Sequence, residues 1–372
     1  MNQRTNQPTR RQQLHSPRRG RQAIIRWLAL PVVLAATLVA AAPAQAYAEQ
    51  EQHCVRRDLP VILTPAPHVA TYRLAGWLCQ PRRPGRTVQL LVPGLTYTHQ
   101  YWTGLDQRTD YVTAAVAAGN AVYLIDRIGT GASDRPPADQ VTLTAEATVV
   151  HQAIQALRDG TLGRYRTVAG VGHSFGTVVW MAEAATYHDV DALVLTGLLH
   201  QIDLDVMTRF TTDLHPAGDD PKFAQSASPE GYLTTLPGRR AAYFLDPATA
   251  EPGASTWDEA TKTTATTGEL TYTPQQELAY SRAITAPILL VVGARDALFC
   301  GPTMPCTHGA DICQREQTTY ASNTGLIAVT IASTGHSLNL HTSAPSTRKV
   351  INGWLRHQAT ESVPGVDLST CH

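Results

Sequence analysis

Short apolar runs alternate with amphipathic segments over most of the chain after residue 60. Six runs are predominantly apolar, which is typical of strands buried on both faces. They comprise residues 87–92, 121–125, 167–171, 192–195, 287–292 and 326–331. Between them, the spacing of apolar residues predicts helices over residues 110–118, 143–157, 177–185 and 346–358. This alternation indicates a doubly wound α/β fold, in which helices cover both faces of a mainly parallel sheet.

One connection in this pattern is too long for a plain loop. Residues 201–285 separate the fourth apolar run from the fifth, and they are rich in Thr, Ala, Asp and Pro. The segment also contains the aromatic residues Phe210, Phe223, Tyr232, Tyr243, Phe244 and Trp257. We interpret it as an inserted lid of short helices. Residues 47–200 and 286–372 then form the α/β core.

The first 46 residues differ in charge from the rest of the chain. They hold seven arginines and no acidic residue, although the formal net charge of the whole chain is zero. An apolar run over residues 27–42 follows the basic part, and Ala44-Gln45-Ala46 resembles a cleavage site. This order predicts a secretory signal peptide over residues 1–46. The alternatives are an uncleaved membrane anchor and, for the export route, a twin-arginine signal.

Removal of this segment would leave 23 basic and 30 acidic residues, so the mature protein would be mildly acidic. Such a surface argues against nucleic acid or an anionic membrane as the main partner. We therefore expect a small-molecule substrate, a secreted protein, and no stable membrane insertion after signal removal.

Cysteine usage agrees with export, because all six cysteines lie after residue 46. An even number in an exported chain suggests three disulfides. We favour Cys54–Cys79, whereas Cys300, Cys306, Cys313 and Cys371 leave three pairings open. The last four lack the CxxC spacing of a zinc site, so we expect no metal and no cofactor.

The sequence GVGHSFG, residues 170–176, contains a candidate nucleophile. Ser174 follows an apolar run and precedes a predicted helix, which is the context of a strand–turn–helix nucleophile. Gly172 and Gly176 would let the tight turn form without a backbone clash. The turn would also direct the N–H of Phe175 toward a developing oxyanion.

A serine hydroxyl needs a base to react. His336, in Thr334-Gly335-His336-Ser337, lies just past the last apolar run and is the preferred base. His341 is the alternative. His173 adjoins the serine but is expected to point the other way and to serve in packing.

The base needs an acid to orient it. Asp296 comes at the end of the preceding strand, where doubly wound sheets assemble their sites. Asp203 and Asp205 are weaker candidates. The predicted triad is therefore Ser174, Asp296 and His336, in this chain order.

A second oxyanion donor is expected after the run over residues 87–92. The turn Pro93-Gly94-Leu95-Thr96 could direct the N–H of Leu95 to the site, and Thr96 could add another. We predict that Thr96, Tyr97, His99 and Trp102 line the substrate pocket. The alternative is that these side chains pack under the lid.

These motifs resemble those of the α/β-hydrolase superfamily, and in particular of secreted, lid-bearing bacterial esterases and lipases. The resemblance covers residues 60–360 and rests on Gly94-Leu95, Gly172 to Gly176, Asp296 and Gly335-His336. It also rests on residues 126–134, DRIGTGASD, which resemble a turn common in the superfamily and which we interpret as structural.

The chain differs from related enzymes at two positions of these motifs. Pro93-Gly94 stands where such enzymes usually have His-Gly before the oxyanion donor. The nucleophile is a serine rather than the aspartate of similar dehalogenases and epoxide hydrolases, so those two activities are disfavoured.

The function predicted from the sequence is that of a secreted serine hydrolase. It would cleave a carboxylic ester or lactone through an acyl-enzyme. The same triad could instead serve peptide or thioester hydrolysis, acyl transfer or elimination. A further alternative is a binding protein without catalytic activity.

Overall fold

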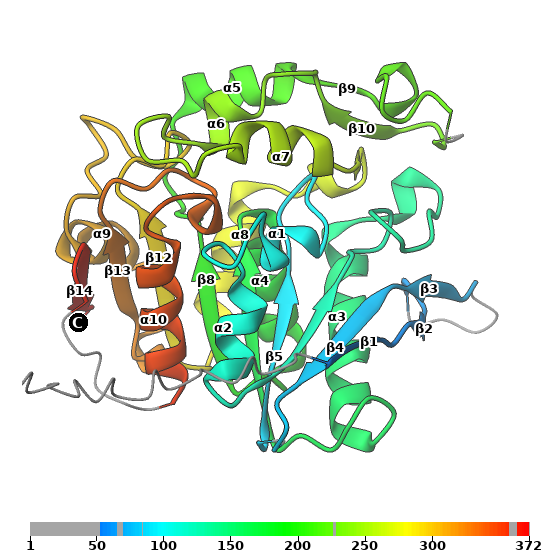
Figure 1. Ribbon diagram of the computed structural model, residues 1–372, viewed down its shortest axis with the longest axis horizontal. Helices are drawn as coiled ribbons and strands as arrows, with labels where there is room; N and C mark the ends of the chain where they lie inside the picture. The colour runs from blue at the N-terminus through cyan, green and yellow to red at the C-terminus, as the bar shows by residue number, and fades with distance from the viewer. Residues whose placement is uncertain (1–52, 65–69, 84, 226–227, 357–362, 372) are drawn as a thin grey trace, which may run out of the picture. The chain divides into compact units, whose positions relative to one another are not determined.

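The computed structural model describes residues 53–64, 70–83, 85–225, 228–356 and 363–371 (Figure 1). The predicted signal peptide, residues 1–46, lies outside the described residues. Among the helices within these ranges, none is both long and apolar enough to cross a membrane.

A nine-stranded sheet forms the centre of the fold (Figure 1). Its strands in spatial order are β1 (His53–Arg56), β4 (Gly76–Gln80), β6 (Ala121–Ile125), β5 (Thr87–Val92), β7 (Thr167–His173), β8 (Ala192–Thr196), β12 (Ile288–Gly293), β13 (Ile327–Ile331) and β14 (Val366–Thr370). The six strands from β6 to β13 run parallel, whereas β1, β4 and β14 pair antiparallel at the two edges. The predicted α/β fold with a mainly parallel sheet is confirmed.

Helices cover both faces of this sheet. One group packs around α4 and comprises α3 (Leu143–Asp159), α4 (Phe175–Tyr187) and α8 (Pro274–Ala283). The other comprises α1 (Gln100–Thr103), α2 (Tyr111–Ala117) and α10 (Ala344–Leu355), of which α2 and α10 cover the near face in Figure 1. Helix α9 (Gly309–Glu316) packs against β13 and β14. A separate hairpin pairs β2 (Leu59–Val61) with β3 (Tyr72–Leu74).

Local sequence signals explain where these helices begin and end. The Thr142 hydroxyl accepts a hydrogen bond from the N–H of Ala145 at the start of α3, and Gly160 ends this helix with a φ of 110°. Asp110 caps α2 in the same way as Thr142 caps α3. Helix α8 begins with a capping box between Thr273 and Gln276.

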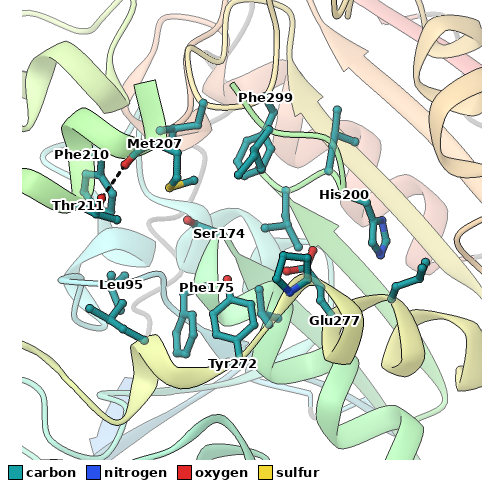
Figure 2. A pocket seen from close by; sticks show the side chains of 18 of the residues that line it. Leu95, Ser174, Phe175, His200, Met207, Phe210, Thr211, Tyr272, Glu277 and Phe299 are labelled. Atoms are coloured by element: carbon teal, nitrogen blue, oxygen red, sulfur yellow. Dashed lines mark hydrogen bonds between the residues drawn. The ribbon is translucent and has the colours of Figure 1, made fainter. Parts of the chain in front are cut away.

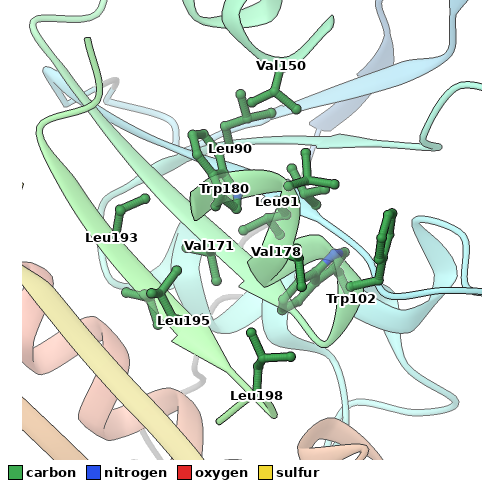
Figure 3. Packing of buried hydrophobic residues seen from close by; sticks show 14 of the residues in the cluster. Leu90, Leu91, Trp102, Val150, Val171, Val178, Trp180, Leu193, Leu195 and Leu198 are labelled. Carbon is green, nitrogen blue, oxygen red and sulfur yellow. The ribbon is translucent and has the colours of Figure 1, made fainter. Parts of the chain in front are cut away.

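The hydrophobic core lies between the parallel strands and the helices. Leu90, Val171 and Leu195 come from adjacent strands and pack with Val178 and Trp180 of α4 (Figure 3). All five side chains are fully buried. Because β7 and α4 form the centre of this core, the turn that joins them has a rigid base.

Residues 201–285 connect β8 to β12 and hold both helices and strands. The elements are α5 (Leu204–Thr212), β9 (Leu214–Pro216), β10 (Tyr232–Thr235), α6 (Ala241–Phe244), α7 (Ala254–Thr261), β11 (Ala265–Thr266) and α8. Strands β9, β10 and β11 form a small antiparallel sheet, so the prediction of helices alone is corrected. We call residues 201–273 the insert and treat α8 apart from it, because α8 packs on α4.

Three disulfides use all six cysteines. Cys54 on β1 pairs with Cys79 on β4, as favoured from the sequence. The two pairings left open are Cys300–Cys306, after β12, and Cys313–Cys371, which joins α9 to the residue after β14. Disulfides of this number are compatible with an extracellular protein.

Candidate active site

Ser174 occupies a strained turn between β7 and α4. Its φ of 53° and ψ of −122° are rare for a residue with a side chain. The turn is tight, because a Cβ on Gly172 would come within 2.7 Å of the Gly176 carbonyl oxygen. The N–H of Ser174 donates to the Thr196 carbonyl of β8 at 2.8 Å, which fixes the turn to the sheet.

His336 and Asp296 form a buried pair. The His336 Nδ1 lies 2.8 Å from the Asp296 Oδ2, and neither side chain is more than 1% exposed. The Asp296 Oδ1 accepts a hydrogen bond from the N–H of Leu298 at 3.0 Å, so both carboxylate oxygens are engaged. If Nδ1 carries the proton, Nε2 is left to accept one, and it has no partner among the described residues.

The pair adjoins the turn of Ser174 through shared walls. The rings of Phe244 and Phe299 stack on the His336 ring at centroid distances of 5.4 and 5.9 Å. The same two rings and Ser174 line one cavity (Figure 2). The three predicted triad residues are therefore gathered at the carboxyl ends of β7, β12 and β13.

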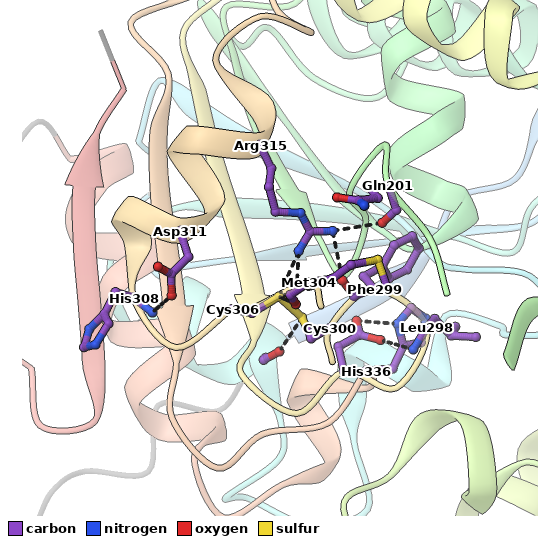
Figure 4. Close-up of a disulfide and its surroundings, with 12 residues drawn as sticks. Gln201, Leu298, Phe299, Cys300, Met304, Cys306, His308, Asp311, Arg315 and His336 are labelled. Atoms are coloured by element: carbon purple, nitrogen blue, oxygen red, sulfur yellow. Dashed lines mark hydrogen bonds and ion pairs between the residues drawn. A yellow bond between two sulfur atoms is a disulfide. The ribbon is translucent and has the colours of Figure 1, made fainter. Parts of the chain in front are cut away.

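Residues 294–306, which we call the β12 loop, carry Asp296. The N–H of Cys300 donates to the Asp296 carbonyl at 2.8 Å, and the Cys300–Cys306 disulfide closes the loop. Arg315 of α9 donates to the Phe299 carbonyl at 3.0 Å (Figure 4). The loop also bonds to residues 201–273, through the Asp203 N–H to the Leu298 carbonyl at 2.8 Å and through Arg295 to Asp246 at 2.9 Å.

Two other histidines have different roles from the predicted base. His341 accepts at Nε2 from the N–H groups of Asp246 and Gly335, and its Nδ1 lies 2.9 Å from the Ser337 carbonyl. Both ring nitrogens are therefore used to hold the loop around His336. The alternative assignment of His341 as the base has no free nitrogen to support it.

His173 does not point away from the site, and the prediction is corrected here. Its ring lies 4.9 Å from the ring of His336 and stacks on Tyr101 at 4.2 Å. Burial lowers the pKa of His173 well below its usual value, with a smaller contribution from His336. A neutral ring beside His336 avoids repulsion when His336 takes up a proton. The predicted packing role for His173 is consistent with these contacts.

The weaker acid candidates lie in the insert. The Asp203 carboxylate accepts a hydrogen bond from the Val206 N–H at 3.0 Å and so caps α5, while Asp205 is exposed in the first turn of that helix. Capping accounts for Asp203 without any role at the site.

Residues 93–97, which we call the β5 loop, lie against Ser174. A Cβ added to Gly94 would come within 3.0 Å of the Ser174 Cβ. No acceptor for the N–H of Leu95 is found within the described ranges. The N–H of Phe175 belongs to the first turn of α4, where such groups lack helical partners. Two N–H groups are thus available near Ser174.

Two buried arginines hold the β5 loop. Arg127 donates from Nε to the Pro93 carbonyl at 3.1 Å and from Nη2 to the Gly94 carbonyl at 3.4 Å. Arg240 of the insert donates from Nη1 to the Thr96 hydroxyl at 2.6 Å. Thr96 also accepts at its carbonyl from the N–H of Thr263 at 2.9 Å. The loop is therefore bonded to both the core and the insert.

Each arginine is neutralised by buried acids. Arg127 pairs with Glu146 of α3 at 2.8 Å and with Glu269 of the insert, and all three side chains are fully buried. Arg240 forms two hydrogen bonds with Asp258, at 2.8 and 3.1 Å. The motif over residues 126–134 contains Arg127, which explains its structural role. Nothing in the local sequence marks Arg240.

A cavity of about 470 Å³ opens beside Ser174 (Figure 2). Leu95, Tyr97 and Phe175 of the core line it, together with Met207 and Phe210 of α5. Its remaining wall residues include Leu198, Leu298, Phe299, Tyr272 and Glu277. Most of the wall is apolar, so the cavity suits a largely apolar ligand.

The structure corrects three of the four predicted pocket residues, since only Tyr97 of the four lines this cavity. Thr96 is fully buried under Arg240, and Trp102 is 1% exposed in the core. His99 stacks on Trp77 at 3.7 Å, and its Nδ1 lies 2.7 Å from Asp126. These three side chains pack against other parts of the protein and do not face the cavity.

The pocket residues missed from the sequence come mostly from the insert and from α8. A partial signal existed for Glu277. It lies four residues before Ser281, and these two side chains share the buried face of α8, which the buried Ile284 follows. A glutamate on the buried face of a helix is unusual and indicates a specific role at that position.

The strand order, the strained serine turn and the His336–Asp296 pair define an α/β-hydrolase fold with a candidate serine site. The alpha/beta hydrolase family matches residues 89–347, and the chain belongs to this family. A search of curated protein sequences finds no match to the chain.

Solved structures of similar fold include several esterases and lipases. A Thermogutta terrifontis esterase is 18% identical with a TM-score of 0.53, over 81% of this chain and 98% of that one. A Paleococcus ferrophilus monoacylglycerol lipase is 16% identical with a TM-score of 0.53, over 77% and 99%. A Bacillus subtilis carboxylesterase is 14% identical with a TM-score of 0.55, over 83% and 93%. At these identities the likeness shows the fold alone.

Proposed function

We propose that this protein is a serine hydrolase that cleaves a carboxylic ester or lactone. The observation that carries the proposal is the strained turn of Ser174 beside a cavity whose walls also contact the His336–Asp296 pair. The esterase and lipase activities named for proteins of similar fold favour this chemistry over others that the same triad serves.

The reaction begins when His336 takes the proton of the Ser174 hydroxyl as this oxygen attacks the acyl carbon. Asp296 orients the ring and stabilises the imidazolium. The N–H groups of Leu95 and Phe175 bind the oxyanion. His336 then protonates the leaving alcohol, and an acyl group remains on Ser174. Water, deprotonated by His336, releases the acid and restores the serine.

The proposed cellular setting is extracellular. A signal peptide over residues 1–46 would export the chain, and the three disulfides support an oxidising environment for the folded part. Mass spectrometry of the N-terminus of the mature protein, purified from its culture medium, tests this part. An intact N-terminus and retention in the cell would contradict it.

Labelling with a fluorophosphonate tests the chemistry, because the reagent modifies activated serines. We expect modification at Ser174 and hydrolysis of short p-nitrophenyl esters. Ser174→Ala should abolish labelling and lower kcat by about 10⁴- to 10⁶-fold. Ser255→Ala is the matched control, since Ser255 is exposed on α7, and it should behave as the unmodified protein.

An unlabelled but folded protein would contradict the proposal and favour a binding function. Product analysis in the presence of a second alcohol separates hydrolysis from acyl transfer. Release of free acid alone supports hydrolysis.

A further inference from the structure

A buried carboxyl group without a protein partner faces the cavity. Glu277 of α8 is 9% exposed and belongs to the cavity wall, and Figure 2 shows its carboxyl group directed inward. Within the described part of the chain, the hydrogen bonds and ion pairs of its neighbour His200 go to Glu316 and Ser281, and none is formed with the Glu277 carboxyl oxygens. A carboxyl group removed from water without a partner is costly, so this position carries a stability cost.

The polar neighbours of Glu277 are occupied elsewhere. His200 holds Glu316 through Nδ1 at 2.6 Å, and its Nε2 lies 2.9 Å from the Ser281 hydroxyl. Thr319 donates its hydroxyl to the Glu316 carbonyl at 2.7 Å. His200 and Thr319 both line the cavity, yet neither forms a hydrogen bond with Glu277. The carboxyl group of Glu277 is therefore free to accept a hydrogen bond from a ligand bound in the cavity.

Most of the wall around this acceptor is apolar. Val178, Leu199, Met207, Phe210 and Leu278 contribute only hydrocarbon or thioether surface. A ligand that fills the cavity beside Ser174 would thus be largely apolar, and Glu277 is the acidic side chain among the described wall residues that it would meet. Buried polar groups of this kind discriminate strongly, because a ligand that lacks the matching donor leaves the protein group unpaired.

We propose that Glu277 is a specificity residue that accepts a hydrogen bond from a hydroxyl or amino group on the otherwise apolar part of the substrate. The substrate class is therefore an ester or lactone with an apolar body that carries one such donor. This inference rests on the proposed function of Ser174, because it concerns the selectivity of the same cavity.

The charge state of Glu277 distinguishes the two donors. Burial raises the pKa of Glu277 to about 7, while the nearby His200 lowers it and Glu316 raises it. An ammonium group binds the ionised carboxylate best, so the ratio of kcat/KM for an amino ester to that for its methyl counterpart should rise as the pH increases through about 7. A hydroxyl group is accepted by either form, so its preference should depend less on pH.

The test uses p-nitrophenyl esters of straight-chain acids that end in a methyl, a hydroxyl or an amino group, over a series of chain lengths. A second series carries the same end groups on the alcohol part. In at least one series, we expect the hydroxyl or amino ester to exceed its methyl counterpart in kcat/KM by about tenfold to a hundredfold. A ratio near one throughout both series overturns the proposal.

Variants of Glu277 test whether this residue causes the preference in kcat/KM for the hydroxyl or amino ester over the methyl ester. Glu277→Leu should bring the ratio of kcat/KM close to one, whereas Glu277→Gln should retain a hydroxyl preference and lose an amino preference. Gln275→Leu is the matched control, because Gln275 lies two residues before Glu277 on the same helix and its side chain is exposed. This variant should keep the ratio. A ratio that survives in Glu277→Leu also overturns the proposal.

A stability measurement separates this role from a structural one. Glu277 has an ordinary pKa of 4.5 and a folded value of about 7. The folded protein is thus most stable with respect to this group below pH 4.5, and loses that stability as the pH rises to about 7. Above this range Glu277→Leu should have a higher Tm than the unmodified protein, since an unpaired charge is removed. A lower Tm would assign Glu277 a structural role instead.

The two proposals fail in different ways. Fluorophosphonate labelling at Ser174 and hydrolysis of the methyl-ended esters report on the catalytic function alone. If labelling fails, calorimetric binding of the same hydroxyl-, amino- and methyl-ended esters to Ser174→Ala still measures the preference for a donor. Equal affinities there would overturn the role of Glu277.

Discussion

The β5 loop and the β12 loop flank Ser174, and they differ in how they are stabilised. The β12 loop carries Asp296 and is closed by a disulfide between residues six positions apart. The β5 loop carries Leu95 and contains no covalent cross-link. It is bonded instead to Arg127, from the turn after β6, and to Arg240, from the insert.

The two loops differ in their contacts with the insert, and these contacts link the insert to the candidate active site. The β12 loop of Asp296 is closed by its own disulfide and held by α9, and the insert adds the Asp203 N–H on the Leu298 carbonyl and Asp246 on Arg295. Thr96 of the β5 loop is held by Arg240 and by the Thr263 N–H, both from the insert. A change at Arg240 should therefore disturb the β5 loop and oxyanion binding first, whereas a change at Asp203 or Asp246 should act on the loops of the acid and the base.

Arg240→Met should have the largest effect. It removes the hydrogen bond to Thr96 and leaves the buried Asp258 carboxylate without its counter-ion. Breaking such a pair costs about 3–5 kcal/mol of unfolding free energy. A shift of the β5 loop should also lower kcat/KM by about 10²-fold. Urea denaturation and ester hydrolysis measure the two effects.

The double variant Arg240→Met with Asp258→Leu separates stability from positioning. Removal of both charges should restore most of the unfolding free energy, because no unpaired ion remains. The catalytic loss should persist, because Thr96 still lacks its donor. Full recovery of kcat/KM would show that Arg240 acts only through stability.

Loss of the Cys300–Cys306 bond should have a smaller effect. A cross-link across six residues of sequence restricts the unfolded chain little, so Cys300→Ala with Cys306→Ala should cost about 2 kcal/mol. We expect kcat/KM to fall as well, since this bond closes the loop of Asp296. Thermal unfolding and ester hydrolysis provide the measurements.

Cys313→Ala with Cys371→Ala is the comparison. That bond spans 58 residues and should contribute about 4 kcal/mol, without contact with the triad. If both pairs changed kcat/KM equally, the Cys300–Cys306 bond would have no particular role at the site.

The smallest effect is expected from Glu146→Gln, and it depends on pH. Burial raises the pKa of Glu146, which shares Arg127 with Glu269. Its contribution to stability is therefore greatest below the ordinary value of 4.5 and is lost as the pH rises through the raised value. The variant should show a flatter dependence of Tm on pH above 4.5. An unchanged dependence would show that Glu146 is not the titrating group.

Strand prediction succeeded in the centre of the sheet and failed at its edges. The six parallel strands β5, β6, β7, β8, β12 and β13 are buried on both faces, so each appears as an apolar run. Edge strands β1 and β14 are partly or largely exposed and have no such run. Helix α9 was also missed, because it is short and largely polar in sequence.

The sequence by itself determined the parallel core and the positions of Ser174, Asp296 and His336, because each of these follows an apolar strand and parallel strands end at one edge. Tertiary structure alone decided the cavity wall and the contacts of Arg240 and Glu277. Those depend on how the insert and α8 fold over the sheet, through contacts between residues far apart in the chain. Local patterns of polarity do not predict such contacts. Whether a buried arginine or glutamate has a partner is therefore decided only in the folded protein.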